Sequence, residues 1–300
     1  MKVCAAGEVL EGIDVSVYQG TIDWTKVRAA GIEFAYIRVS DGLPPIDSRF
    51  TQNWAAARTA GVLRGAYQFF REDEDPVAQA DLLLDTMGPL EDDDLPAAID
   101  VESTDGQTGA TIVAHVKAWM DRVEAGSGKR PIIYTGRPFW DSNTGSSTAV
   151  SDHTLWIPNW YVTCPSISVA WSSWGFWQYS STGQIDGISG DVDRDEWNGD
   201  RAALLAFAGV VAAPDAPAPD APTPDAPTPD APTSDAPTSD APSGPTSPDA
   251  DAVGGCAVVS AAGGGGDHRA VLAWALALAL VAVIRARFPL RRARAKIPSP

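Results

Sequence analysis

Residues 95–102 read Leu-Pro-Ala-Ala-Ile-Asp-Val-Glu, an apolar run that ends in two acids. Side chains alternate across a strand, so Asp100 and Glu102 face one way while Ile99 and Val101 face the other. With a rise of about 3.3 Å per residue, the two acids are about 6.6 Å apart at Cα. Carboxylates this close do not both ionise freely, and one pKa rises. The pair therefore predicts a general acid beside a charged partner, which is the arrangement that glycosidic cleavage requires.

Around this stretch, strand-like and helix-like segments alternate from residue 8 to residue 210. The strand-like segments are 12–18, 34–39, 63–70, 97–102, 131–134, 155–157, 175–179 and 191–193. The helical segments are 23–30, 48–60, 75–87 and 111–125, which end near Gly31, Gly61, Gly88 and Gly126. Alternation of this kind predicts an α/β fold with a parallel sheet or barrel. Five βα units followed by three short strands would close an eight-stranded barrel that lacks its last helices, with catalytic residues at the carboxyl ends of the strands.

Acids also occur on the first and last of these strands. Asp14 lies inside the apolar first strand, and Asp193 lies in the final one. A charge among apolar residues is costly unless it faces a polar cavity. Paired acids on one strand are common on solvated surfaces, but carboxylates on three strands are harder to explain in that way. We therefore expect Asp14 and Asp193 to support Asp100 and Glu102 in one acidic site.

Aromatic residues along the later strands have two interpretations. They are Tyr67, Tyr134, Trp156, Trp160, Trp177 and Tyr179. Sugars present apolar C–H faces that stack on aromatic rings, whereas Trp and Tyr also fill protein cores. All of these except Trp160 are candidate substrate-binding residues. Tyr134 and Trp177 are the best placed, because they fall near strand ends where the pocket should open.

Charge and motif spacing exclude several other classes of function. The net charge is −17, and an acidic globular part without a basic face repels nucleic-acid phosphates. Residues 191–195 resemble the start of a calcium loop, but its sixth position is Glu196 and its twelfth is Ala202, so we expect no EF-hand. His115 and His153 lack the spacing of metal ligands. We expect no metal, no cofactor and no nucleic-acid partner.

The chain changes character after residue 210. Residues 211–253 repeat Pro, Asp, Ala and Thr with almost no bulky apolar residues, which predicts a disordered linker. Residues 254–300 contain Cys256, an apolar segment at 270–284 that we expect to be a short helix, and an arginine-rich end. The apolar segment is shorter than the roughly 20 residues that span a bilayer comfortably. The positive charge after it would nonetheless hold that end in the cytoplasm.

This order of features resembles the C-terminal sorting tails of the myxobacterial kind. The resemblance implies that Cys256 is a processing or lipid-attachment site, and that the tail holds the domain at the membrane. The domain would then lie outside the cytoplasm, at the cell envelope or surface or released from it; an ordinary single-pass anchor is the alternative. No export signal is visible at residues 1–8, because no apolar segment follows Lys2. Secretion would therefore need a start upstream of Met1 or another export route.

Two of the three cysteines, Cys4 and Cys164, lie at opposite ends of the globular region in sequence. Cys164 has no His signature of a catalytic nucleophile nearby, which favours a structural thiol or a disulfide. In an oxidising compartment the two are able to pair, and we state a disulfide between them as a hypothesis.

The motifs of the globular region form an ordered series. They are Gly-Ile-Asp-Val-Ser at 12–16, Gln-Gly at 19–20, Ile-Asp-Trp at 22–24, Gly-Ala-Tyr at 65–67, Ala-Ile-Asp-Val-Glu at 98–102, Pro-Ile-Ile-Tyr-Thr at 131–135, Leu-Trp-Ile at 155–157, Trp-Gln-Tyr-Ser at 177–180 and Gly-Ile at 187–188 before Val-Asp at 192–193. In this order and spacing, residues 11–207 resemble the family 25 glycoside hydrolases, the Chalaropsis-type lysozymes. The resemblance implies a flattened, TIM-like (β/α)5β3 barrel and a monomeric N-acetylmuramidase that acts on peptidoglycan glycan strands.

Carried over by motif, Glu102 is the general acid and Asp100 its partner, with Asp14 and Asp193 lining the same pocket. The family is thought to use the 2-acetamido group of the substrate as nucleophile, so Asp100 would stabilise an oxazolinium-like intermediate. A direct enzyme nucleophile and an inverting water stay open. A weakened peptidoglycan-binding module and a chitin-type endoglycosidase are the alternative functions.

Two positions depart from the family pattern. Gln68 stands where a His often follows Gly-Ala-Tyr, and Pro158-Asn159-Trp160 stands where Ala-x-Tyr often follows Trp-Ile. Neither departure touches the acids. We expect both to affect sugar contacts or rate.

Overall fold

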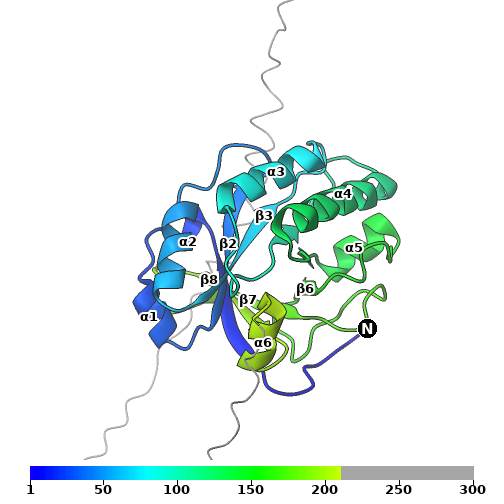
Figure 1. Cartoon of the computed structure of the whole chain (residues 1–300). Coiled ribbons are helices and arrows are strands. Elements are labelled where there is room, and N and C mark those ends of the chain that lie inside the picture. The colour runs from blue at the N-terminus through cyan, green and yellow to red at the C-terminus, as the bar shows by residue number, and fades with distance from the viewer. Residues whose placement is uncertain (211–300) are drawn as a thin grey trace, which may run out of the picture. The chain divides into compact units, whose positions relative to one another are not determined.

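The computed structural model describes residues 1–210, in which eight strands close into one barrel in sequence order (Figure 1). The strands are β1 (Leu10–Val15), β2 (Phe34–Asp41), β3 (Leu63–Phe69), β4 (Ala98–Asp100), β5 (Ile132–Tyr134), β6 (Leu155–Pro158), β7 (Phe176–Gly183) and β8 (Val192–Trp197). Neighbours from β1 to β7 are parallel, whereas β8 is antiparallel to both β7 and β1. The predicted α/β fold with an eight-stranded barrel is confirmed, except that the last strand runs in the opposite direction.

Helices follow the first five strands and the last one, and Figure 1 shows α1 to α5 around the outside of the strands. They are α1 (Trp24–Ala29), α2 (Phe50–Thr59), α3 (Pro76–Met87), α4 (Gly109–Ser127), α5 (Arg137–Thr144) and α6 (Arg201–Ala208). Asp23 and Asp75 cap α1 and α3 by accepting from the backbone N–H three residues later, as Asp does at a helix start.

Three features of the helices differ from the sequence predictions. No helix was expected after the last strand, but Asp200 caps α6 there by accepting from the N–H of Ala203 at 2.7 Å. α5 completes the fifth βα unit without having been predicted. α4 runs through Gly126 and ends at Gly128, whose φ is 72°. A Cβ at Gly126 would lie 2.5 Å from Leu84 of α3, so this glycine allows close helix packing rather than ending the helix.

The first strand also ends earlier than predicted, at Val15 instead of Tyr18. The Ser16 N–H donates to the Gln19 side chain at 2.9 Å, and the Ser16 side chain accepts from Tyr18. These bonds compete with the strand ladder and form a single 3-10 turn at Val17–Gln19.

Aromatic side chains fill the inside of the barrel. Phe34 and Tyr36 of β2 pack against Phe176 with ring centroids 5.3 and 5.4 Å apart, and all three are fully buried. Glycines provide the room for these rings. A Cβ at Gly12 would lie 2.2 Å from the Phe34 ring, and one at Gly65 would lie 2.4 Å from the Tyr36 ring. The inside of the barrel is therefore filled by side chains, and a site must lie at an end of the barrel rather than within it.

The segment before residue 8 belongs to the same domain. The Val3 N–H donates to Pro165 O at 3.0 Å, and Trp174 Nε1 donates to Val3 O at 2.7 Å. A disulfide joins Cys4 to Cys164, as the sequence hypothesis stated. This bond and the β-bridge between Lys2 and Ser166 fasten the amino terminus to the segment that follows β6.

Several sequence predictions lie outside the described residues. They are the linker at 211–253, the tail at 254–300 with its apolar helix at 270–284, and Cys256. Within residues 1–210, none of the helices has the length and apolar character needed to cross a membrane.

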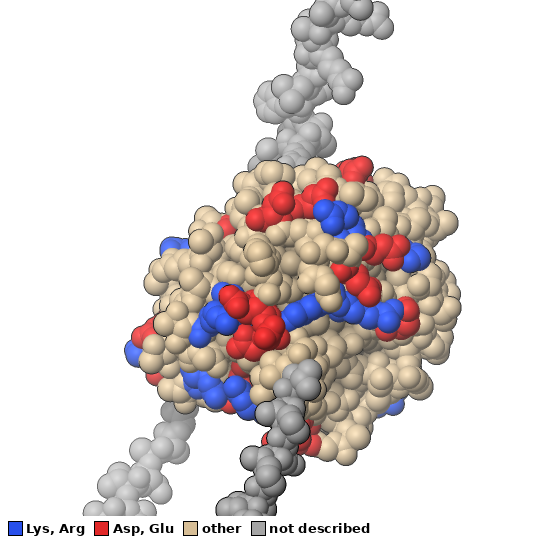
Figure 2. Space-filling view, viewed as in Figure 1, with Lys and Arg blue, Asp and Glu red and all other residues tan. Residues whose placement is uncertain are grey.

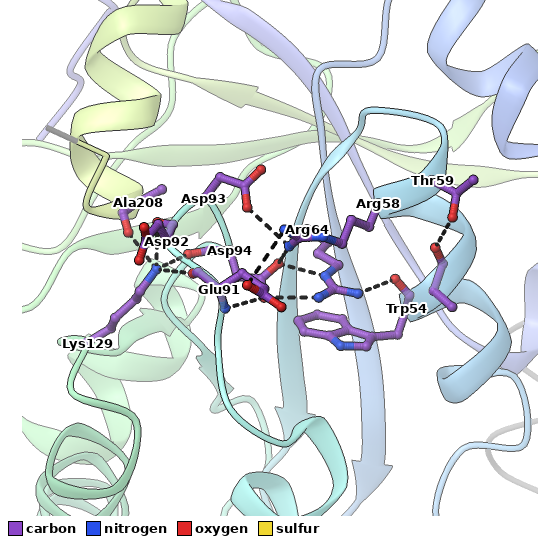
Figure 3. Close-up of polar contacts among 11 residues, drawn as sticks. Trp54, Arg58, Thr59, Arg64, Glu91, Asp92, Asp93, Asp94, Lys129 and Ala208 are labelled. Atoms are coloured by element: carbon purple, nitrogen blue, oxygen red, sulfur yellow. Dashed lines mark hydrogen bonds and ion pairs between the residues drawn. The ribbon is translucent and has the colours of Figure 1, made fainter. Parts of the chain in front are cut away.

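A dense polar network lies where β3 and β4 begin. The carboxylate of Asp94, 1% exposed, accepts from Arg64 Nε at 2.6 Å and Arg64 Nη2 at 3.1 Å, and Arg58 Nη1 lies 3.3 Å away. Nearby, the Lys129 ammonium donates to backbone carbonyls of residues 91, 92, 94 and 208 at 2.6–3.0 Å (Figure 3). On the face drawn in Figure 2, acidic residues likewise lie directly beside basic ones.

Candidate active site

The strand directions bring acids from three strands to one end of the barrel. Asp14 is near the carboxyl end of β1, and Asp100 is the last residue of β4. Because β8 is antiparallel, Asp193 near its start lies beside Asp14 in the strand register. Glu102 lies two residues beyond β4 rather than on it, so the strand alternation used in the sequence argument applies only as far as Asp100. The structure still places all four acids close enough to perturb one another.

Burial is the main cause of the raised pKa values of the acids at this end of the barrel. Asp14 is 6% exposed and Asp100 is 9% exposed, and loss of solvent raises the pKa of both well above the usual range. The charges of neighbouring acids add to this: Asp193 acts on Asp14, and Glu102 acts on Asp100. The pKa of Asp193 rises to about 6, mainly by burial and then by repulsion from Glu102. These groups therefore retain protons at a pH where free carboxyls lose them.

Glu102 differs from its neighbours in being exposed at the rim. Its pKa is still raised, because the protein shields part of its carboxyl group from water and loss of solvent disfavours the charged form. The Arg71 guanidinium opposes that rise. Arg71 is itself paired with Asp41, at 2.5 Å from Nε to Oδ1, so it does not neutralise Glu102. In the same way Arg38, which favours the charged form of Asp100, is paired with Asp47 at 3.1 Å.

A fifth acid was missed in the sequence. Asp195 is fully buried on β8, where Trp156 Nε1 donates to Oδ1 at 2.8 Å and Oδ2 has no hydrogen-bond partner among the described residues. Burial raises its pKa well above the usual range. Asp193 and Asp195 are two residues apart on one strand, as Asp100 and Glu102 are in the sequence. The same alternation argument applied to β8 would have found Asp195.

Gln178 of β7 was also missed, and it links several groups of the site. Its Nε2 donates to Asp14 Oδ2 at 2.7 Å, and its Oε1 accepts from Tyr134 Oη and Trp160 Nε1, each at 3.1 Å. An amide suits this position because it donates to a carboxylate while accepting from an O–H and an N–H. Gln178 therefore orients Asp14 and joins β1, β5 and β7 at the mouth of the barrel.

The predicted aromatic residues divide into two groups. Tyr67 and Tyr134 face the acids, since the pKa of each is raised first by burial and also by the charges of Asp14 and Asp100. Trp156 is 1% exposed and its ring lies 4.9 Å from that of Tyr134. Trp156 therefore supports the acids from within the core and has no exposed face for a sugar.

Trp177 and Tyr179 lie on the other side of β7 from Gln178. Trp177 Nε1 donates to Asn159 O at 2.9 Å, and Tyr179 Oη donates to Glu11 Oε2 at 2.8 Å. The structure does not bring these two rings together with the acids. The sequence argument expected Trp177 to line the pocket. Because side chains alternate along a strand, Trp177 instead lies on the face opposite to Gln178.

Gln68 also lies away from the acids. It is fully buried, with Nε2 donating to Ser40 Oγ at 3.0 Å and Oε1 accepting from Trp119 Nε1 at 2.7 Å. These partners lie on the helix-facing side of β3, in the layer with α4. The departure from the family pattern at this position therefore changes packing and makes no contact with the acids.

Taken together, this end of the barrel holds carboxyl groups with few cations. Such a cluster keeps some members protonated and others charged at one pH, which supplies a proton donor beside a negative charge. Acid cleavage of an acetal such as a glycosidic bond needs both. The arrangement thus suits glycoside chemistry.

Comparison with known proteins agrees with this chemistry. Residues 13–188 match the family described as Glycosyl hydrolases family 25. The chain is 37% identical over 211 residues to Lysozyme M1 of Streptomyces globisporus, across 66% of this chain and 71% of that protein. It is 31% identical to the N,O-diacetylmuramidase of Chalaropsis sp, across 62% of this chain and 96% of that protein. The bacterial lysozyme from Streptomyces coelicolor superposes with a TM-score of 0.64 and 35% identity, across 67% of this chain and 97% of that one. The chain therefore belongs to glycosyl hydrolase family 25 and is a glycoside hydrolase of the lysozyme and muramidase type.

Proposed function

We propose that the chain hydrolyses the β-1,4 bond between N-acetylmuramic acid and N-acetylglucosamine in peptidoglycan. The observation that carries the proposal is the pair Asp100 and Glu102, one buried and one exposed, whose neighbouring cations Arg38 and Arg71 are paired with other acids. The names of the family relatives, lysozyme and N,O-diacetylmuramidase, support the same bond.

In the proposed mechanism Glu102 is the general acid. Its raised pKa favours the protonated form and its exposure gives it access to substrate. Glu102 gives its proton to the bridging oxygen as the C1–O bond breaks, while the carbonyl oxygen of the 2-acetamido group bonds to C1. Asp100, in the ionised form that Arg38 favours, stabilises the resulting oxazolinium ion by accepting a hydrogen bond from its N–H. Water then attacks C1, Glu102 recovers a proton, and the acetamido group is restored.

Asp14 and Asp193 support this pair. Repulsion within the cluster keeps protons on some members, so that Asp100 and Glu102 do not both ionise. The route through the acetamido group predicts retention at C1. Proton NMR of the first-formed anomer tests this, and the inverted anomer would replace the route with direct attack by water.

The function is tested by digesting purified peptidoglycan with the full chain and reducing the new ends with borohydride. Mass spectrometry should then identify reduced N-acetylmuramic acid. Reduced N-acetylglucosamine would overturn the assigned bond. Binding without any new reducing end would indicate a peptidoglycan-binding module instead.

We also propose that the globular domain, residues 8–210 with the segment before it, acts outside the cytoplasm. The proposed substrate is found there, and a disulfide such as Cys4–Cys164 persists in oxidising compartments. A linker at 211–253 and a membrane-directed tail at 254–300, processed or lipidated at Cys256, would hold it at the envelope. Cell fractionation with protease shaving checks this, and a protease-protected cytoplasmic domain would contradict it.

A further inference from the structure

A cleft opens between α5 and the segment that follows β6. Its volume is about 640 Å³, within the range of pockets that hold small molecules. Pro138 and Ser142 of α5 line one side, and Pro158, Trp160 and Val162 line the other. None of these residues belongs to the acid cluster.

A chain of hydrogen bonds links the lining of the cleft to the acid cluster. Trp160 Nε1 donates to Gln178 Oε1 at 3.1 Å, and Gln178 Nε2 donates to Asp14 Oδ2 at 2.7 Å. The backbone makes a second link, since the Asn159 N–H donates to Gln178 O at 3.1 Å. Pro158 is the last residue of β6, so the cleft lies at the same end of the barrel as Asp100.

The lining suits a neutral sugar. Trp160 is 42% exposed, although its N–H is bonded to Gln178. A pyranose places its apolar C–H face on such a ring, and its hydroxyls then meet polar groups at the edge. Asn159 and Ser142 lie in the same lining. The one cation of the lining, Arg137, is paired with Asp141 at 3.2 Å, so the cleft has no free charge for an anionic peptide.

We propose that this cleft is a glycan subsite in which Trp160 stacks on a sugar beyond the cleaved linkage. The inference rests on the proposed function and adds to it a preference for longer glycan strands. A strand anchored in the cleft stays aligned with Asp100 and Glu102, whereas a short fragment lacks that anchor. The contact acts through binding, so it lowers KM for long strands.

The test compares the native chain with Trp160→Ala and Trp160→Phe on purified peptidoglycan oligosaccharides of one, two and four disaccharide units. Loss of the ring should raise KM for the longest substrate about 2- to 12-fold, the range of an aromatic contact, and any change in kcat from the lost bond to Gln178 should be the same at every substrate length. The KM for the shortest cleaved substrate should not change. Trp160→Phe keeps a ring face without the N–H and should retain most of the affinity for long strands.

Val77→Ala serves as the control, because Val77 is an exposed apolar residue on α3, outside the cleft. Unchanged KM values in Trp160→Ala at every length would overturn the subsite. Equal losses in both Trp160 variants at every length would also overturn it, because they would show that only the bond to Gln178 matters. If the native chain releases no products, the proposed function fails. In that case calorimetry compares the binding of the longest oligosaccharide to the native chain and to Trp160→Ala. Weaker binding to the variant would support the glycan subsite independently of catalysis, and equal binding would overturn it.

Discussion

At the amino end of the barrel the buried carboxylate of Asp94 accepts two bonds from Arg64 and lies beside Arg58. At the carboxyl end the buried carboxylate of Asp100 leaves Oδ1 without a hydrogen-bond partner among the described residues. Asp94 precedes the first residue of β4 by four positions and Asp100 is the last residue of that strand, so the two are six residues apart in sequence. The difference is therefore in their surroundings and not in their chemical type.

The comparison shows that carboxylates at one end of the barrel stabilise the fold, while carboxylates at the other end are arranged for proton transfer. A carboxylate with matched donors is stabilised in its charged form and holds segments together, so it has little reactivity left. Carboxylates crowded together without matched cations destabilise the fold when charged, but they exchange protons near the working pH. Four changes, from the largest expected effect to the smallest, test this separation.

The largest effect is expected for Glu102→Gln. Removing the proton donor should lower the rate of peptidoglycan cleavage about 10³-fold, the size of a general-acid contribution. Because the change removes a negative charge from the crowded acids, the thermal unfolding midpoint should not fall. Assays of new reducing ends and a thermal melt measure the two quantities. Glu124→Gln, the same change at an exposed position on α4, should keep full activity, and near-native activity in Glu102→Gln would disprove the assignment.

Asp94→Asn should have the opposite outcome. Arg64 would lose a buried charged partner, and the free energy of unfolding should fall by about 3 kcal/mol. Activity per folded molecule should not change. Urea unfolding followed by Trp fluorescence gives the first value. The control Asp93→Asn breaks only a half-exposed pair with Arg58 and should cost less than about 0.5 kcal/mol; equal losses in the two variants would contradict the comparison.

Glu72 tests the cost of a buried acid. It is fully buried after β3, and neither carboxyl oxygen has a hydrogen-bond partner among the described residues, although His115 Nδ1 lies 3.6 Å from Oε2. Burial, then Asp105, raises its pKa to about 8. Below about pH 4.5 both folded and unfolded states are protonated, so the group has no effect. Between about 4.5 and 8 only the unfolded state releases the proton, so stability falls as pH rises, and the penalty is complete above 8.

Replacing this acid by Gln should therefore stabilise the chain at high pH alone. We expect a gain of about 2 kcal/mol at pH 9 and almost none at pH 4, less than the pKa shift alone gives because the amide is also left unpaired. Urea unfolding at both pH values measures the gain for Glu72→Gln. A pH-independent change would show that packing rather than charge is responsible.

Lys129→Met is expected to give the smallest effect. The change removes the donors to four carbonyls at the amino end, but water reaches this half-buried site and replaces part of the loss. Stability should fall by about 1 kcal/mol, with activity unchanged. Lys117→Met, which breaks an exposed pair with Asp121 on α4, is the control and should change stability by less than about 0.5 kcal/mol.

Several parts of this picture were accessible from the sequence. Apolar periodicity and glycine positions predicted the barrel and four of its six helices. α6 was missed although Asp200 is a good cap, because the pattern of short aromatic strands after β5 suggested loops. The acids Asp14, Asp100, Glu102 and Asp193 were found because a carboxylate within or beside an apolar strand is improbable without a polar cavity.

The sequence by itself determined which strands carry acids, because strand alternation and apolar runs are local properties of the chain. Only the tertiary structure decided which face of β7 points toward the acids, since aromatic residues stand on both faces of that strand, Phe176 on the side of Gln178 and Tyr179 on the side of Trp177. It also decided the direction of β8, which brings Asp193 beside Asp14 and the missed Asp195 opposite Gly12. The closure of the barrel fixes both the inward face of β7 and the direction of β8. It depends on contacts between residues more than 160 positions apart, such as Gln178 with Asp14.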